Sequence, residues 1–297
     1  MAENIFFTTT FPDGYYYEDY YDYEYYRKVY IIMHVVTCII IAIGLPLMLM
    51  AIYALYSLVQ NDHVVPIYII NLLITDLIQL CCLIVWESKP QELWIYEILY
   101  YVYNSGLVTS VCFMVCISLE RYLVIAHPMW YHFKQPIRSS VAICVVVWLI
   151  APVYFLTVYP WVTMAVTEIV FSVFLTIPLP LFIFSLVGTL RALSTSVSVS
   201  PDEKRRIVRI LVLVLLIYTL LFLPSIIWII AKTKTDPVDN TLNDLSFMFV
   251  KLSPLADLLL YVFIRKETFE KLLTSVCCCR KERSDTNNSN TINVDNI

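Results

Sequence analysis

Charge is scarce in this sequence. Only 15% of the 297 residues are Asp, Glu, Lys or Arg, whereas 60% are hydrophobic. Soluble domains carry about 25% charged and about 45–50% apolar residues, so the composition excludes a soluble globular enzyme. The same apolar content excludes a disordered chain. The net charge of −4 argues against nucleic acid as a partner, because nucleic-acid-binding domains are usually basic.

Several patterns are also missing. The sequence shows no repeat of 20–50 residues and no polar–apolar alternation of the kind that builds a membrane barrel. It shows no nucleophile–base pair, metal-ligand cluster or phosphate-binding loop, so we do not expect an enzyme. Two related halves with broken polar helices, which would indicate a transporter, are not found. These absences favour a helical bundle that crosses the lipid bilayer.

Seven apolar segments are long enough to span a membrane, which takes about 20 residues. Five of them contain long charge-free stretches, and the other two enclose Asp76 or the pair Lys251 and Asp257. The predicted fold class is an all-α membrane protein, a seven-transmembrane helix bundle with a short interfacial eighth helix. The expected spans are about 29–57, 65–86, 95–126, 138–158, 167–191, 205–231 and 242–264, with an interfacial helix at 265–274 and a cytoplasmic tail at 275–297.

Lys and Arg predict the orientation. With residues 1–28 outside, the outer segments hold five of these residues and the inner segments fourteen. Because positive charge collects on the cytoplasmic side, we expect a plasma-membrane protein with its N-terminus outside. No cysteine falls in an outer segment, so we expect no extracellular disulfide.

One motif carries a family resemblance. The third span ends in Glu120-Arg121-Tyr122 and continues to His127-Pro128, which resembles the signature of rhodopsin-like (class A) G-protein-coupled receptors. The likeness extends to the other spans. Spans 6 and 7 in particular resemble those of the branch that contains purinergic, lysolipid and proton-sensing receptors. It implies a heterotrimeric G protein as partner and the switch residues Glu120, Arg121, Tyr122, Phe222, Pro224, Asp257 and Tyr261.

Ionisable groups inside a bilayer are costly and tend to mark function. Asp76 lies in the middle of its span, and with Ser110 and Asp257 it would form an oxygen-rich site for Na⁺. A water-mediated polar knot or a protonated Asp76 are the alternatives. Otherwise no cofactor is expected. Glu120 and Arg121 would form a charge pair that locks a resting state, unless Arg121 only extends to the water interface.

The sequence departs from the family pattern at several positions. Tyr96 replaces the usual cysteine at the start of span 3, and the loop between spans 4 and 5 is short and lacks the partner cysteine. Met48 replaces the span 1 asparagine, Leu186 the span 5 tyrosine and Leu258 the span 7 proline. The last two changes remove parts of the usual activation relay, so a weakly signalling decoy or scavenger receptor is the alternative function.

The outer halves of the spans should form the ligand pocket. Lys251 lies in an apolar segment and needs an anion or a carbonyl group as partner. Glu87 is the internal candidate for this partner. The alternative is a carboxylate or phosphate group of a ligand, which would suit a lysolipid or a nucleotide. Lys251 also stands ten residues before Tyr261, as the retinal-linked lysine of opsins does, but Leu99 stands where the counterion is usual. The expected pocket residues are Trp86, Glu87, Tyr100, Tyr103, Asn104, Leu107, Phe247 and Lys251.

The two ends of the chain predict modification. Residues 1–28 form an acidic, Tyr-rich extracellular tail that we expect to be disordered, because few aliphatic residues are present to build a core. Within it, residues 15–26 read YYYEDYYDYEYY, an acidic tyrosine run that resembles the sulfated heads of chemokine and related peptide receptors and would attract a basic peptide or protein. A cysteine triplet follows the last span, where palmitoylation is common. An unmodified tail and free thiols are the alternatives. The candidates are Tyr15, Tyr16, Tyr17, Tyr20, Tyr21, Tyr23, Tyr25, Tyr26, Cys277, Cys278 and Cys279.

Overall fold

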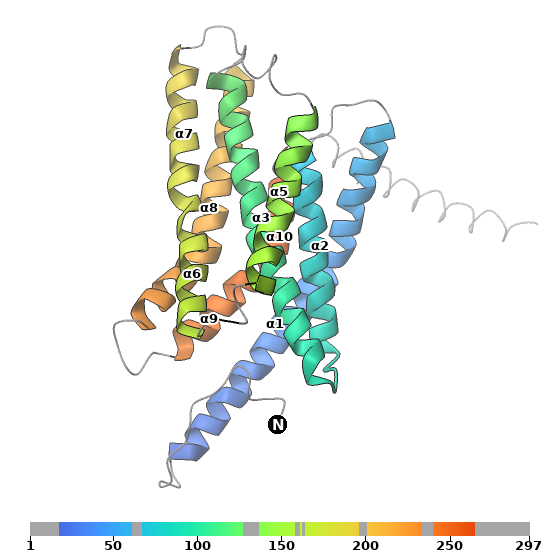
Figure 1. Cartoon of the computed structure of the whole chain (residues 1–297), viewed down its shortest axis with the longest axis vertical. Helices are drawn as coiled ribbons and strands as arrows, with labels where there is room; N and C mark the ends of the chain where they lie inside the picture. Colours follow the sequence, from blue (N-terminus) through green and yellow to red (C-terminus); the bar gives the residue numbers. More distant parts are fainter. Residues whose placement is uncertain are drawn as a thin grey trace, which may run out of the picture.

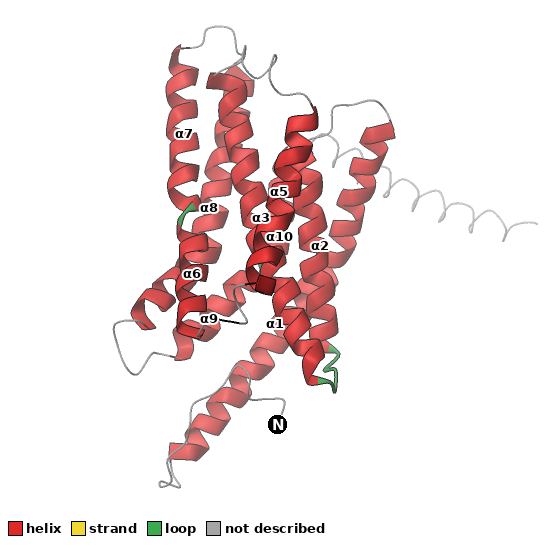
Figure 2. Ribbon diagram, in the orientation of Figure 1, coloured by secondary structure: helices red, strands yellow, loops and turns green. Residues whose placement is uncertain are grey.

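The computed structural model describes residues 18–60, 67–126, 137–157, 161, 164–195, 201–232 and 240–264. In these residues all regular structure is helical (Figure 2). The helices are α1 (Glu18–Gln60), α2 (Ile67–Glu87), α3 (Leu93–Ala126), α5 (Ile137–Thr157), α6 (Met164–Thr176), α7 (Pro178–Thr195), α8 (Pro201–Lys232), α9 (Asn240–Lys251) and α10 (Ser253–Ile264). The predicted all-helical membrane bundle is confirmed.

The helices run side by side along one axis, and α3 lies at the centre, in contact with α2, α5, α7 and α8 (Figure 1). Among the described residues, six segments are long and apolar enough to cross a membrane, or seven when α9 and α10 count as one span. Their outward faces carry many exposed Ile, Leu and Val side chains, whereas polar groups such as Thr75, Ser110 and Asp257 are buried. This distribution suits a bundle whose solvent is lipid.

Two expected spans are broken helices. The fifth is divided into α6 and α7 at Ile177, where Pro178 lacks the N–H that would continue the hydrogen-bond ladder. The seventh bends by 41° between α9 and α10, just before Pro254. There the backbone N–H groups of Leu255 and Ala256 both donate to the Leu252 carbonyl at 3.1 Å. Proline therefore explains both breaks, as it explains most sharp kinks.

Helix α1 begins earlier than the sequence predicts. Disorder is expected over residues 1–28. In the structure, residues 18–28 are helical and continue α1 beyond the bundle (Figure 1). Once the span has formed a helix, each added residue costs little, since only nucleation is unfavourable. Glu24 and Lys28 add an exposed pair at 2.9 Å, one turn apart. The hydrogen bond with Lys28 lowers the pKa of Glu24.

The turn between α2 and α3 is fixed by local hydrogen bonds. The Ser88 hydroxyl donates to the Val85 carbonyl at 2.7 Å, and the backbone N–H of Lys89 donates to the Trp86 carbonyl at 3.2 Å. Lys89 has a φ of 50°, the left-handed conformation that ends many helices. Its ammonium group lies 5.1 Å from the centre of the Tyr30 ring. A hydrogen bond with Tyr30 raises the pKa of Lys89, so this turn is attached to α1.

Candidate functional site

The middle of the bundle holds a buried polar cluster drawn from α2, α3 and α10. The Ser110 hydroxyl donates to Asp257 Oδ2 at 2.9 Å, and the Ser253 hydroxyl lies 3.5 Å from the same oxygen. On the other side, Gln79 Nε2 donates to Asp76 Oδ1 at 3.4 Å. Asp76 and Asp257 are fully buried and interact with each other. The three residues expected to form the sodium site are therefore neighbours.

The chemistry of this polar cluster fits a small hard cation. Asp76 Oδ2, Asp257 Oδ1 and Gln79 Oε1 are buried oxygen atoms without a hydrogen-bond partner in the described residues. Two neighbouring carboxylates in a low-dielectric interior cannot both stay ionised without a proton or a cation between them. Carboxylate, hydroxyl and amide oxygens are ligands that suit Na⁺. The cluster has only two acidic groups, and within the described residues no three His, Cys, Asp or Glu side chains are grouped to hold a metal.

The C-terminal end of α3 holds the expected charge pair. Arg121 Nη2 lies 3.7 Å from Glu120 Oε2, and both side chains are partly shielded. The next residue, Tyr122, packs edge-on against Phe184 of α7, with ring centres 5.4 Å apart. A Cβ atom at Gly188 would lie only 2.6 Å from the Tyr122 ring. The missing side chain at position 188 thus lets α7 approach the Glu120-Arg121-Tyr122 motif.

An aromatic stack joins α8 to the broken fifth span. Phe222 is fully buried and its ring lies 4.9 Å from Tyr218, which in turn lies 4.9 Å from Phe182 of α7. The Tyr218 hydroxyl donates to the Leu175 carbonyl, in the last turn of α6. The break at Ile177 therefore has a direct attachment to α8, in the same helix as Pro224.

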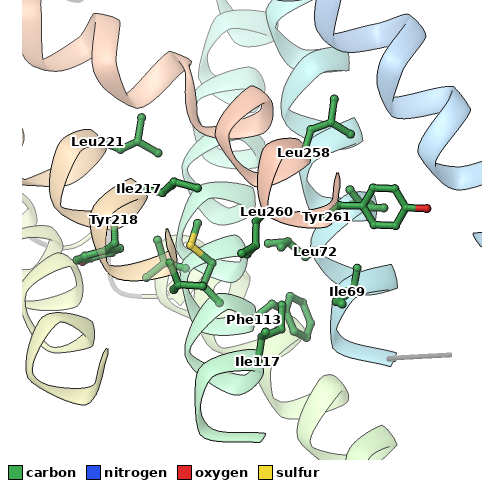
Figure 3. Close-up of a cluster of buried hydrophobic side chains, with 14 of the residues drawn as sticks. Ile69, Leu72, Phe113, Ile117, Ile217, Tyr218, Leu221, Leu258, Leu260 and Tyr261 are labelled. Atoms are coloured by element: carbon green, nitrogen blue, oxygen red, sulfur yellow. The ribbon is translucent and has the colours of Figure 1, made fainter. Parts of the chain in front are cut away.

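Figure 3 shows the apolar surroundings of Tyr218 and Tyr261. Tyr261 of α10 is almost fully buried, in the same cluster as Leu72 of α2 and Phe113 of α3. Phe113 also packs against Trp148 of α5 at 6.1 Å. Trp148 donates to Asn71 Oδ1 at 2.8 Å, which ties α5 to α2. Phe222 and Tyr261, two of the expected switch residues, therefore lie in the same hydrophobic core.

At the opposite end of the bundle, α1, α2 and α9 come together around Lys251. Lys251 Nζ donates to the buried hydroxyl of Thr37 at 3.2 Å, and Thr37 donates in turn to the Met33 carbonyl at 2.7 Å. Glu87, the expected internal partner of Lys251, instead hydrogen-bonds His34. It acts on Lys251 only through electrostatic attraction. Glu87 pairs with His34 and not with Lys251 because the His34 side chain of α1 contacts the Glu87 carboxylate of α2 directly.

The other expected pocket residues lie on three helices. Trp86 ends α2 and packs edge-on against Tyr96 at 5.7 Å, while Asn104 donates to the Tyr100 carbonyl one turn earlier in α3 at 2.8 Å. Tyr103 has a buried hydroxyl without a described partner, Leu107 is part of the core, and Phe247 is exposed on α9. Whether they bind a ligand stays a prediction.

The modification sites fall largely outside the description. Tyr15, Tyr16, Tyr17 and the cysteines 277–279 lie outside the described residues, as does the expected interfacial helix at 265–274. For Tyr20, Tyr21, Tyr23, Tyr25 and Tyr26 only the helical backbone of α1 is described. These predictions therefore stay predictions.

Sequence reasoning missed several residues of the site. Gln79 and Ser253 belong to the polar cluster, and both lie one turn from an acid, at positions 76 and 257. That spacing places them on the same helix face and would have indicated them. His34 and Thr37 are separated from their partners by long stretches of sequence, and no local pattern indicates them.

The fold and site define a multi-pass helical membrane protein with a buried polar cluster at its centre. The family model of the seven-transmembrane receptors (rhodopsin family) matches residues 47–168. The chain is 24% identical to human G-protein coupled receptor 68 (80% of this chain, 74% of the relative). It is also 24% identical to rat Proteinase-activated receptor 2 (86% and 73%). The matched segment and the relatives support a rhodopsin-like (class A) G-protein-coupled receptor.

Proposed function

We propose that this receptor recognises an extracellular ligand through an anionic group that binds Lys251, and transmits binding to a heterotrimeric G protein. The proposed orientation is supported by the excess of Lys and Arg in the inner segments, and it has residues 1–28 outside the plasma membrane and the Glu120-Arg121-Tyr122 motif inside. Ligand binding would act by shifting the balance between resting and active arrangements of the helices. The ligand class that suits this site is a lysolipid or a nucleotide-like anion.

The position of Lys251 is the observation that supports an anionic ligand group. An ammonium group has three donors, and the described hydrogen bond of Lys251 is to the neutral Thr37 hydroxyl. The nearby carboxylate, Glu87, is engaged by His34. A carboxylate or phosphate oxygen would therefore give Lys251 a charged partner that the described residues do not give it directly. A cation within an apolar segment gains most from such a partner.

A G-protein activation assay with a library of lysophospholipids, nucleotides and basic peptides tests this proposal. Loss of a hydrogen bond to a charged group costs about 1.5–3 kcal/mol, so Lys251→Gln should raise the half-maximal ligand concentration about 10- to 100-fold. Lys251→Arg should keep most of the potency. Lys28→Gln, at an exposed position of α1, is the matched control. An active ligand whose potency is unchanged by Lys251→Gln would contradict the proposal.

A basic peptide or protein is the other ligand class, and the acidic tyrosine run is its basis. Sulfation of that run would strengthen the attraction. Changing the eight tyrosines to Phe should then weaken binding of a basic ligand, and more strongly at low salt than at high salt. Equal affinity at both salt concentrations would remove the tail from ligand recognition.

Palmitoylation of Cys277–Cys279 would anchor the cytoplasmic tail. Metabolic labelling with palmitate tests this, because replacing all three cysteines with Ser should abolish the label.

A weakly signalling decoy is the second candidate function. Leu258 is almost fully buried at the position where the family has proline, and Leu186 stands where it has tyrosine. If the receptor is a decoy, ligand binds but activates no G protein, and Leu258→Pro with Leu186→Tyr restores activation. Activation by the unmodified receptor, abolished by Arg121→Ala, would exclude the decoy.

A further inference from the structure

The surface of α7 carries a groove that none of the expected switch residues lines. It is lined by Pro180, Ile183, Phe184, Val187, Gly188 and Arg191, and its volume is about 360 Å³. All but the last of these residues are apolar. Phe184 is 56% exposed although it is large and aromatic. Helix α7 stands at the edge of the bundle (Figure 1), so the groove opens toward the surroundings of the bundle.

The residues that line the groove extend along α7 over a length that suits one lipid chain. Its residues recur every three or four positions, so they follow one face of the helix. Eleven residues separate Pro180 from Arg191, which corresponds to about 16 Å along an α-helix. That length is close to half of the roughly 30 Å hydrocarbon core, the depth of one leaflet. Arg191 lies at the end of the groove, one turn before α7 ends at Thr195.

We propose that this groove binds an anionic phospholipid of the inner leaflet. One acyl chain lies along Ile183, Phe184 and Val187, and the headgroup meets the guanidinium group of Arg191. Charge complementarity identifies the occupant, because the cytoplasmic leaflet carries the anionic lipids and basic groups near its surface attract them. The inference rests on the proposed orientation, which places the Arg191 end of α7 on the cytoplasmic side.

The bound lipid is connected to the receptor switch through two contacts. Phe184 lines the groove and packs against Tyr122, and Gly188 lines it where the Tyr122 ring comes closest to α7. Tyr122 is the neighbour of Arg121, which pairs with Glu120. A lipid in the groove therefore restrains Phe184 and, through it, the α7–α3 contact beside the charge pair.

Native mass spectrometry of the purified receptor tests the site. Phosphatidylserine or phosphatidylcholine is titrated and the bound lipid counted. Phosphatidylserine should bind more tightly, and Arg191→Gln should weaken it about fivefold, as expected for one basic group near the membrane surface. Val187→Trp, which fills the groove, should remove one bound lipid of either kind. Arg205→Gln is the matched control, an exposed basic residue at the start of α8.

Two results would overturn the proposal. Equal affinity for the two lipids would show an ordinary lipid-facing groove, and equal losses in Arg191→Gln and Arg205→Gln would show unspecific attraction to basic charge. The measurement in detergent does not depend on orientation. Orientation is tested separately by antibody access to an N-terminal epitope tag in intact cells, so its failure is distinguishable from failure of the lipid site.

Discussion

At Gly188 the backbone of α7 lies very close to the Tyr122 ring of α3. A methyl group there would lie 2.6 Å from Cε2 and 3.1 Å from Cδ2 of Tyr122. We expect Gly188→Ala to lower the free energy of unfolding by about 1–3 kcal/mol, the usual effect of overpacking. Thermal melting in one detergent measures this. Gly106→Ala is the matched control, since its added carbon would meet the flexible Gln79 side chain at 3.2 Å. Equal melting temperatures for the two variants would contradict the close approach.

At the residue scale, sequence reasoning succeeded where partners are adjacent in the chain or where the family resemblance groups them. The Glu120–Arg121 pair follows from adjacency, and the grouping of Asp76, Ser110 and Asp257 follows from the family resemblance. The partner of Lys251 could not be derived that way. Glu87 has the right charge, but whether it meets Lys251 or His34 depends on how α1 and α2 are rotated against each other, which no local pattern encodes.

At the element scale, Tyr218 holds the broken fifth span to α8. The Leu175 carbonyl lies in the last turn of α6, and the buried Tyr218 hydroxyl donates to it. Tyr218→Phe keeps the ring packing and removes this donor, so we expect the free energy of unfolding to fall by about 1–2 kcal/mol, the usual loss for a buried hydrogen bond. Thermal melting checks it, with Tyr53→Phe as control because Tyr53 is 65% exposed on α1. Equal effects of the two variants would exclude the attachment.

The elements themselves were largely predictable, because charge-free length is a direct consequence of bilayer thickness. The breaks at Ile177 and Leu252 were indicated by prolines at 178 and 254, but proline can either bend a helix or divide it. The outward extension of α1 was not predicted. An acidic tyrosine-rich composition has few apolar contacts to offer, and the helix there continues from the neighbouring span rather than from its own packing.

At the scale of the whole molecule, the polar cluster joins α2, α3 and α10 at the centre of the bundle. If Na⁺ binds there, it stabilises all three helices against separation. A ligand at a hundred times its dissociation constant adds about 2.7 kcal/mol to the free energy of unfolding. We therefore expect the melting temperature to rise by several degrees when Na⁺ replaces N-methylglucamine at equal ionic strength. Asp76→Asn should abolish this rise, whereas Glu24→Gln, at an exposed carboxylate of α1, should leave it unchanged. The opposite result would be equal melting temperatures in both salts together with a more stable Asp76→Asn variant. It would mean that a proton rather than a cation neutralises the two buried carboxyl groups, because an amide at position 76 imitates the protonated acid.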